Sequence, residues 1–345
     1  MATIRKRGDY QWHVQIRRQG FPNQTRTFES KADAELWAKT VESEMGRGVF
    51  VSRTAAEKTT FRELIDRYVV EVVPTHRGHE SESIRLKAMA RRDIANKTAA
   101  ALTSADFAKY RDARLKEVKP ATVHRELGLF QQVIDQAQRE WGINLHDNPV
   151  KNVSRPRLDN ARERRLDPDE EKYIINATNG CLTPWLRPLA EFALETAMRQ
   201  EELCKLTWDR IDFAAPSAHL PKTKNGDARA VPLSSRAVAI LKEMPRSIGG
   251  RVFPMTTGAV KQSWARTVKR ARKQYEKDQV AAGNNPAKAF LDNLHFHDLR
   301  HEATSRLAMK VPNVIMLARI TGHKDLQMLK RYYHPKVEDL AKMLG

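Results

Sequence analysis

The chain has 345 residues, a formal net charge of +19 and a hydrophobic content of 41%, which is enough for packed cores and argues against a disordered basic tail. No apolar run approaches the roughly 20 residues of a membrane helix, which argues against a membrane protein. The two cysteines are far apart in the sequence, which argues against a disulfide framework. We therefore expect two or three domains in a reducing cytoplasm, with no membrane partner and, because of the charge, a polyanionic ligand such as nucleic acid.

The first fifty residues predict a small β-sheet backed by one helix. Polar and apolar residues alternate over 10–17, as in a half-buried strand, and 24–28 can return as a second strand after a turn. Ser30, followed by Asp33, predicts a helix N-terminus. An ordinary solvated strand face is the alternative to a DNA-reading surface here. The candidate DNA contacts of this module are Arg5, Lys6, Arg7, Arg17, Arg18 and Arg26.

The next hundred residues predict an all-helical segment. Helices are expected over 81–95, 104–115 and 120–140, and another begins near Thr60, with apolar residues at helical spacing. Asn148-Pro149 ends the last helix, and a basic, proline-containing linker follows. A helical bundle with a partly basic surface is common, so this segment alone indicates little about function. Its candidate DNA contacts, with those of the linker, are Lys87, Arg91, Arg92, Arg125, Arg155 and Arg157.

Beyond the linker, two basic residues stand out. Arg199 falls in an otherwise apolar region, 192–203, which predicts a helix, and a buried arginine is costly unless it is paired or holds an anion. Glu202 could be its partner. Residues 219–233 predict two strands around an Asn-Gly turn, with Lys224 beside the turn.

The last fifty residues contain His297-Asp298-Leu299-Arg300, then Gly322-His323, then Tyr332. Guanidinium groups grip phosphate oxygens bidentately, a phenolic oxygen can attack phosphorus, and a lysine can protonate the leaving oxygen. The histidines at 295, 297 and 301 have metal-like spacing, but a zinc site would leave Arg300 and Tyr332 without a role. The residue types therefore favour phosphodiester chemistry.

In order and spacing, these residues resemble the tyrosine recombinases, the phage integrase family, over about residues 165–345. The resemblance implies a mainly α fold with small β elements: an arm-type DNA-binding domain of sheet and helix at 1–55, a helical core-binding domain at 56–155, and a mixed α/β catalytic domain at 156–345. The C-terminal tail is then expected to pack on a neighbouring protomer. Thr321 stands where the family more often has leucine, a difference that we expect to affect packing more than chemistry.

The resemblance also implies a mechanism that needs neither metal nor ATP. Tyr332 would form a 3′-phosphotyrosyl intermediate, with Tyr333 as the reserve nucleophile. The implied partners are double-stranded DNA attachment or inversion sites, a homotetramer, and a host bending protein or directionality factor, at the bacterial nucleoid. The other implied roles are charge stabilisation by Arg199 and Arg300, leaving-group protonation by Lys224, phosphate contact by His323, proton movement by His297, and support of Arg199 by Glu202.

Three alternatives share part of this pattern. A type IB topoisomerase has the same chemistry without tetramers, and the N-terminal sheet and trailing helix argue against it. Residues 194–200 and 294–303 also resemble shufflon-type DNA invertases, which usually lack a front arm domain, so an integrase of a phage or mobile element is favoured. A DNA-binding protein without activity predicts a broken catalytic set, whereas all six positions are filled.

Overall fold

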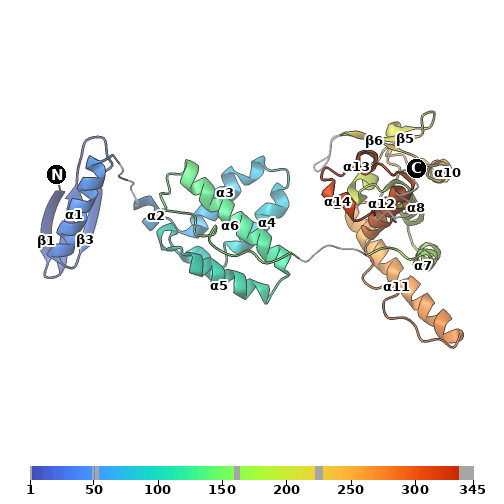
Figure 1. The fold of residues 1–345 in the computed structure, drawn as a ribbon, viewed down its shortest axis with the longest axis horizontal. Helices are drawn as coiled ribbons and strands as arrows, with labels where there is room; N and C mark the ends of the chain where they lie inside the picture. The colour runs from blue at the N-terminus through green and yellow to red at the C-terminus, as the bar shows by residue number, and fades with distance from the viewer. Residues whose placement is uncertain (1, 49, 51–53, 159–163, 222–227, 334–345) are drawn as a thin grey trace, which may run out of the picture. The chain divides into compact units, whose positions relative to one another are not determined.

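The computed structural model describes residues 2–48, 50, 54–158, 164–221 and 228–333, and it divides the chain into two compact units, 1–160 and 161–345 (Figure 1). Most of the described elements are helices, and the strands form two small antiparallel sheets. The predicted fold class, mainly α with small β elements, is therefore confirmed. Within the described ranges, no helix is long and apolar enough to cross a membrane.

The first unit begins with a three-stranded sheet in the order β1-β2-β3, formed by Ala2–Gly8, Gln11–Ile16 and Gln24–Phe28, and by α1 at Lys31–Gly46. The apolar residues of β2, Val14 and Ile16, are fully buried against Ala34 and Ala38 of α1. Ser30 caps α1 by accepting a hydrogen bond from the backbone of Asp33 at 3.1 Å. The sequence did not predict β1, because its basic residues hide the alternation that marks a strand.

The helical part of the first unit packs around a cluster of aromatic rings. Phe61, Phe107 and Phe130 are fully buried, and their ring centroids lie 5.0–5.7 Å apart. This burial removes apolar surface from water and holds the helices together. The elements are α2 (Thr54–Lys58), α3 (Phe61–Glu71), η1 (Val73–Thr75), α4 (His79–Met89), η2 (Asp93–Asn96), η3 (Ala99–Ala101), α5 (Ser104–Leu115) and α6 (Pro120–Glu140).

Of the three helix ranges predicted for this part, those of α5 and α6 are confirmed, and α3 begins directly after Thr60 as expected. The expected helix over 81–95 is wrong at both ends, because α4 spans His79–Met89 and the chain continues as a separate 3-10 turn. Leu86 and Met89 are the buried residues of α4, whereas Ile84 is 72% exposed. The apolar pattern therefore runs past the point at which the helix stops.

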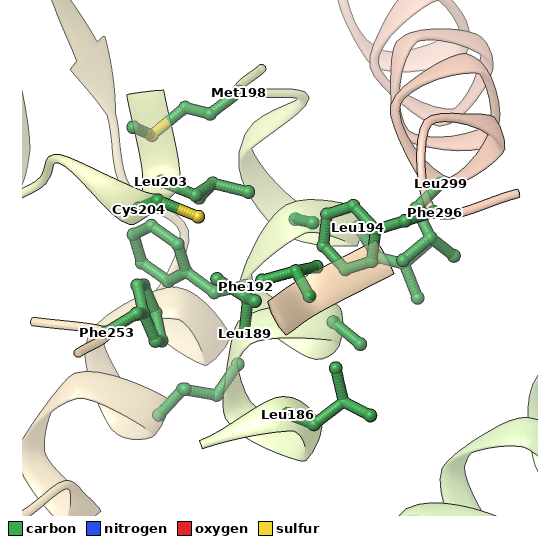
Figure 2. Close-up of a cluster of buried hydrophobic side chains, with 14 of the residues drawn as sticks. Leu186, Leu189, Phe192, Leu194, Met198, Leu203, Cys204, Phe253, Phe296 and Leu299 are labelled. Carbon is green, nitrogen blue, oxygen red and sulfur yellow. The ribbon is translucent and has the colours of Figure 1, made fainter. Parts of the chain in front are cut away.

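The second unit surrounds one central helix, α8. Figure 2 shows its apolar residues in the middle of the core, with Phe253 on one side and Phe296 on the other. Leu189 and Phe192 are fully buried. The elements are α7 (Pro168–Thr178), α8 (Leu186–Thr196), α9 (Gln200–Cys204), η4 (Trp208–Arg210), β4 (Ile211–Asp212), β5 (Ser217–Leu220), β6 (Arg229–Pro232), α10 (Ser235–Glu243), α11 (Thr257–Ala281), α12 (Asp298–Lys310), α13 (Val314–Thr321) and α14 (Gln327–Lys330).

The strands β5 and β6 pair antiparallel, with Ala218 opposite Val231 and both side chains buried. This confirms the two predicted strands. Residues 222–227, which include Lys224, lie outside the described residues, as do residues 334–345.

Candidate active site

Arg199 lies at a break between two helices. α8 ends at Thr196, Ala197 has a left-handed backbone with φ 50°, and Arg199 is the N-cap of α9. The single helix that the sequence predicted over 192–203 is therefore wrong. The break leaves the Arg199 side chain 26% exposed, instead of enclosed among the apolar residues of the core.

Glu202 holds this end of the site in place. Its carboxylate accepts hydrogen bonds from the backbone and from Nη1 of Arg199 at 2.8 and 3.0 Å, and from both terminal nitrogens of Arg229 at 3.0 and 2.8 Å. Burial alone would raise the pKa of Glu202, but the two arginines outweigh that effect and lower it. The carboxylate is therefore charged and bridges β6 to α9.

Arg300, on the first turn of α12, is the buried member of the arginine set. It donates hydrogen bonds to the carbonyls of Ala197 and Thr321, the latter at 2.8 Å. Burial, and then the charge of Arg199, lower the pKa of Arg300 to about 9, which leaves it charged at neutral pH. The nearby carboxylate of Glu202 offsets part of this effect, and a bound anion would offset more of it.

Three consecutive carbonyls at the end of α13 each accept a hydrogen bond from a different arginine. Ile320 accepts from Arg229 at 3.2 Å, Thr321 from Arg300, and Gly322 from Arg199 at 2.8 Å. The last carbonyls of a helix have no partners within the helix, so these arginines also cap α13.

Gly322 is required at this turn for two reasons. Its φ is +70°, in the region that glycine adopts without strain. A Cβ at this position would lie 2.7 Å from Cζ of Arg229, closer than non-bonded carbon atoms approach, so the Arg229 side chain would have to move.

His323 is held by Thr321 on one side and by Arg300 on the other. Thr321 Oγ1 donates to the Leu317 carbonyl at 2.8 Å and lies 2.6 Å from His323 Nδ1, so it accepts from a protonated Nδ1. Nε2 then faces Arg300 Nη2 at 3.4 Å as an acceptor. Burial, followed by the charges of Arg300 and Arg199, lowers the pKa of His323 to about 3. Thr321 therefore contacts a candidate site residue in addition to its packing within α13.

Tyr332 contacts two residues that the sequence analysis did not select. Its hydroxyl lies 2.6 Å from His301 Nδ1 and 3.4 Å from Arg331 Nη2. The neighbouring Tyr333 instead donates to the Val311 carbonyl at 2.6 Å. The two adjacent tyrosines thus have different surroundings, and only the hydroxyl of Tyr332 lies among basic side chains in the described contacts.

His297 precedes α12 as its N-cap residue and is exposed. Its ring lies 5.3 Å from the ring of His301 at an angle of 87°. The metal reading of the nearby histidines has no support among the described residues, where no group of three histidine, cysteine or acidic side chains could hold an ion.

The predicted contacts of the N-terminal sheet do not lie on one face. Arg5 is opposite His13 and so points away from α1, since Val14 and Ile16 point toward it. Lys6 and Arg26 have the parity of the helix-covered face, being opposite Trp12 and Val14. Arg18 donates to the Glu42 carbonyl on α1 at 3.3 Å. The remaining two, Arg7 and Arg17, are exposed.

The predicted contacts of the helical segment also divide into two groups. Arg92 pairs with both carboxylate oxygens of Glu117 at 3.2 and 3.0 Å. Arg155 is half-buried and donates to the His124 carbonyl and to Gln131, which fastens the end of the segment onto α6. The others are exposed on α4, α6 or the segments that follow: Lys87, Arg91, Arg125 and Arg157.

Comparison with known proteins agrees with this arrangement. The phage integrase family model matches residues 164–339, and the phage integrase N-terminal domain model matches 57–157. A shufflon-specific DNA recombinase of Escherichia coli is 36% identical over 296 residues, which cover 83% of this chain and 72% of the relative. A Haemophilus influenzae homologue named integrase/recombinase is 35% identical over 353 residues, covering 98% and 89%. A lambda integrase tetramer bound to a Holliday junction has a TM-score of 0.67 at 19% identity, covering 96% of this chain and 94% of that one.

Proposed function

The chain belongs to the phage integrase family of tyrosine recombinases, and from this premise we propose which residues carry out its reaction. It is a site-specific DNA recombinase that cuts and rejoins strands through a 3′-phosphotyrosyl intermediate. One observation carries the proposal: Arg199 and Arg300, from different helices, converge with His323 on the turn at Gly322. Guanidinium groups held in this way suit the oxygens of one phosphate.

In the proposed cleavage step, Tyr332 Oη attacks the scissile phosphorus and the bond from phosphorus to the 5′ oxygen breaks. Arg199 and Arg300 stabilise the charge that develops on the non-bridging oxygens. Lys224, whose role we propose from the family resemblance of its sequence, protonates the leaving 5′ oxygen. A hydroxyl from the partner duplex reverses the step, so the phosphotyrosine conserves the bond energy.

The histidines have supporting roles in this proposal. Nε2 of His323 is a hydrogen-bond acceptor in the free protein. It can donate to phosphate only after it is protonated, so the bound anion must first raise the pKa of His323. His297, whose ring lies against that of His301, assists proton movement on the side of Tyr332. Glu202 steadies Arg199 through the pair of hydrogen bonds described above.

The test is covalent trapping on a nicked DNA substrate that carries the core site of the element and releases a short strand after cleavage. We expect a 3′-phosphotyrosyl adduct that maps to Tyr332 and forms in EDTA, because the proposed chemistry uses only side chains. Specific binding of the core site without an adduct would contradict the proposal and favour a DNA-binding role.

We propose further that the recombinase acts as an integrase of a phage or mobile element. Four protomers would exchange strands between two duplexes at the nucleoid, helped by a host bending protein or a directionality factor. The N-terminal sheet and helix support this role, because a small sheet of this kind can enter the major groove of DNA and bind an arm site. Inversion of a DNA segment is the second candidate, and the shufflon-specific relative favours it.

Charge reversal at Arg5 tests the arm-site role. Arg5 lies on the open face of the sheet, so Arg5→Glu should reduce integration into full attachment sites at least tenfold, since it replaces an attraction to phosphate by a repulsion. Cleavage of the isolated core site should stay within twofold. Arg47→Glu, at the exposed C-terminal end of α1, makes the same charge change on a residue that is not part of the sheet. Equal integration by the two variants would argue that this sheet does not read DNA.

A further inference from the structure

His301, which lies beside the hydroxyl of Tyr332, has no role in the cleavage step above. His301 Nδ1 lies 2.6 Å from Tyr332 Oη, and the two rings lie 6.3 Å apart at an interplanar angle of 25°. His301 is half-buried on α12, one residue after Arg300, so the same turn of helix points one side chain toward the carbonyls at Thr321 and the next toward the tyrosine.

The third member of this contact, Arg331, indicates where the protons lie. Nη2 of Arg331 is 3.4 Å from both Tyr332 Oη and His301 Nδ1. A guanidinium can only donate hydrogen bonds, so a protonated Nδ1 would face another donor. The consistent arrangement has the phenol donating to a bare Nδ1, with Arg331 beside the phenolic oxygen. The hydrogen of the imidazole then lies on Nε2.

The charge state of His301 agrees with this arrangement. Burial, followed by the positive charges of His297 and Arg331, lowers the pKa of His301 to about 4; Arg300 acts in the same direction and Asp298 against it. The imidazole is therefore neutral near pH 7, and its Nδ1 lone pair is available. A phosphate bound at the arginines adds negative charge nearby, which raises the pKa and makes the imidazole a better proton acceptor.

On the basis of the proposed function, we propose that His301 is a further catalytic residue, the base that takes the phenolic proton as Tyr332 attacks. The proton moves from Oη to Nδ1 while the bond from Oη to phosphorus forms. The bond to the 5′ oxygen breaks, and that oxygen takes a proton from Lys224. The imidazolium returns its proton to Tyr332 when the strand is resealed. His301 thus takes the proton itself, and His297 acts through it.

The first experiment measures single-turnover cleavage of the nicked substrate by His301→Ala, with and without added imidazole. We expect a loss of about 10²- to 10⁴-fold, the usual effect of a general base, and a partial recovery that grows with imidazole concentration. His295→Ala, an exposed histidine in the same segment, is the matched control and should stay within twofold. Recovery by imidazole in His297→Ala, with none in His301→Ala, would overturn the proposal.

A second substrate shows which proton transfer is lost when His301 is replaced. Sulfur in place of the scissile 5′ oxygen leaves without protonation, so it should restore cleavage by Lys224→Ala and fail to restore cleavage by His301→Ala. His301→Gln keeps a hydrogen-bond acceptor that cannot titrate in this range, and it should be as slow as His301→Ala. A wild-type rate for His301→Gln, or restoration of His301→Ala by sulfur, would contradict the role as a base. An absence of adduct with the wild-type protein would instead contradict the proposed function itself.

Discussion

Replacing Tyr332 by phenylalanine is expected to abolish the covalent adduct while leaving DNA binding intact. The substitution removes the only atom that attacks phosphorus in the proposed mechanism and keeps the ring, which packs against the small cluster around Leu317 and Leu329. The lost hydrogen bond to His301 should cost no more than about 1 kcal/mol of folding stability. Trapping on the nicked substrate, with binding measured by a mobility shift, checks both parts of the expectation.

Tyr333→Phe is the matched control for this substitution. Its hydroxyl donates to the Val311 carbonyl rather than to a basic side chain, and burial raises the pKa of Tyr333. We expect adduct formation within a few fold of wild type. An adduct that persists in Tyr332→Phe and disappears in Tyr333→Phe would transfer the nucleophile to Tyr333.

Arg199→Ala is expected to slow cleavage by about 10³-fold or more, because one of the two positive groups that stabilise charge on the phosphate is lost. The fold should tolerate the change, since Arg199 is partly exposed and Arg229 still holds Glu202 through two hydrogen bonds. Loss of one phosphate contact among many should weaken binding only slightly. Single-turnover cleavage at saturating protein, with a thermal melt, measures both effects.

The matched control is Arg187→Ala, which removes an exposed arginine of α8 that pairs with Glu191. It should cleave within twofold of wild type. Near-normal cleavage by Arg199→Ala, with a normal melt in both variants, would contradict the proposed arginine pair. A large loss of thermal stability in Arg199→Ala would assign this residue to the fold instead.

The sequence predicted much of this chain because its signals are local. The apolar spacing of α6 and the Ser30 cap of α1 depend on neighbouring residues, and both are confirmed. The arginine and histidine motifs likewise identified residues that the fold brings together, since Arg199, Arg300 and His323 meet at one turn.

What the sequence did not predict depends on contacts between distant segments. Arg229 was not among the predicted site residues, because its pairing with Glu202 spans 27 positions. The position of His301 directly after Arg300 could have indicated that it lies near the site. Its contact with Tyr332, however, spans 31 positions of the sequence. Ala197, whose left-handed backbone ends α8, is an unusual residue for that conformation, so the sequence did not indicate that the helix ends there.

The row of carbonyls at the end of α13 makes three arginines depend on a single small element. Ile320, Thr321 and Gly322 are consecutive, so a shift or rotation of this turn displaces the acceptors of Arg229, Arg300 and Arg199 together. We therefore expect a change at this turn to displace the three arginines together rather than one at a time. At the other end of α13, near its start, Ile315 and Met316 are exposed.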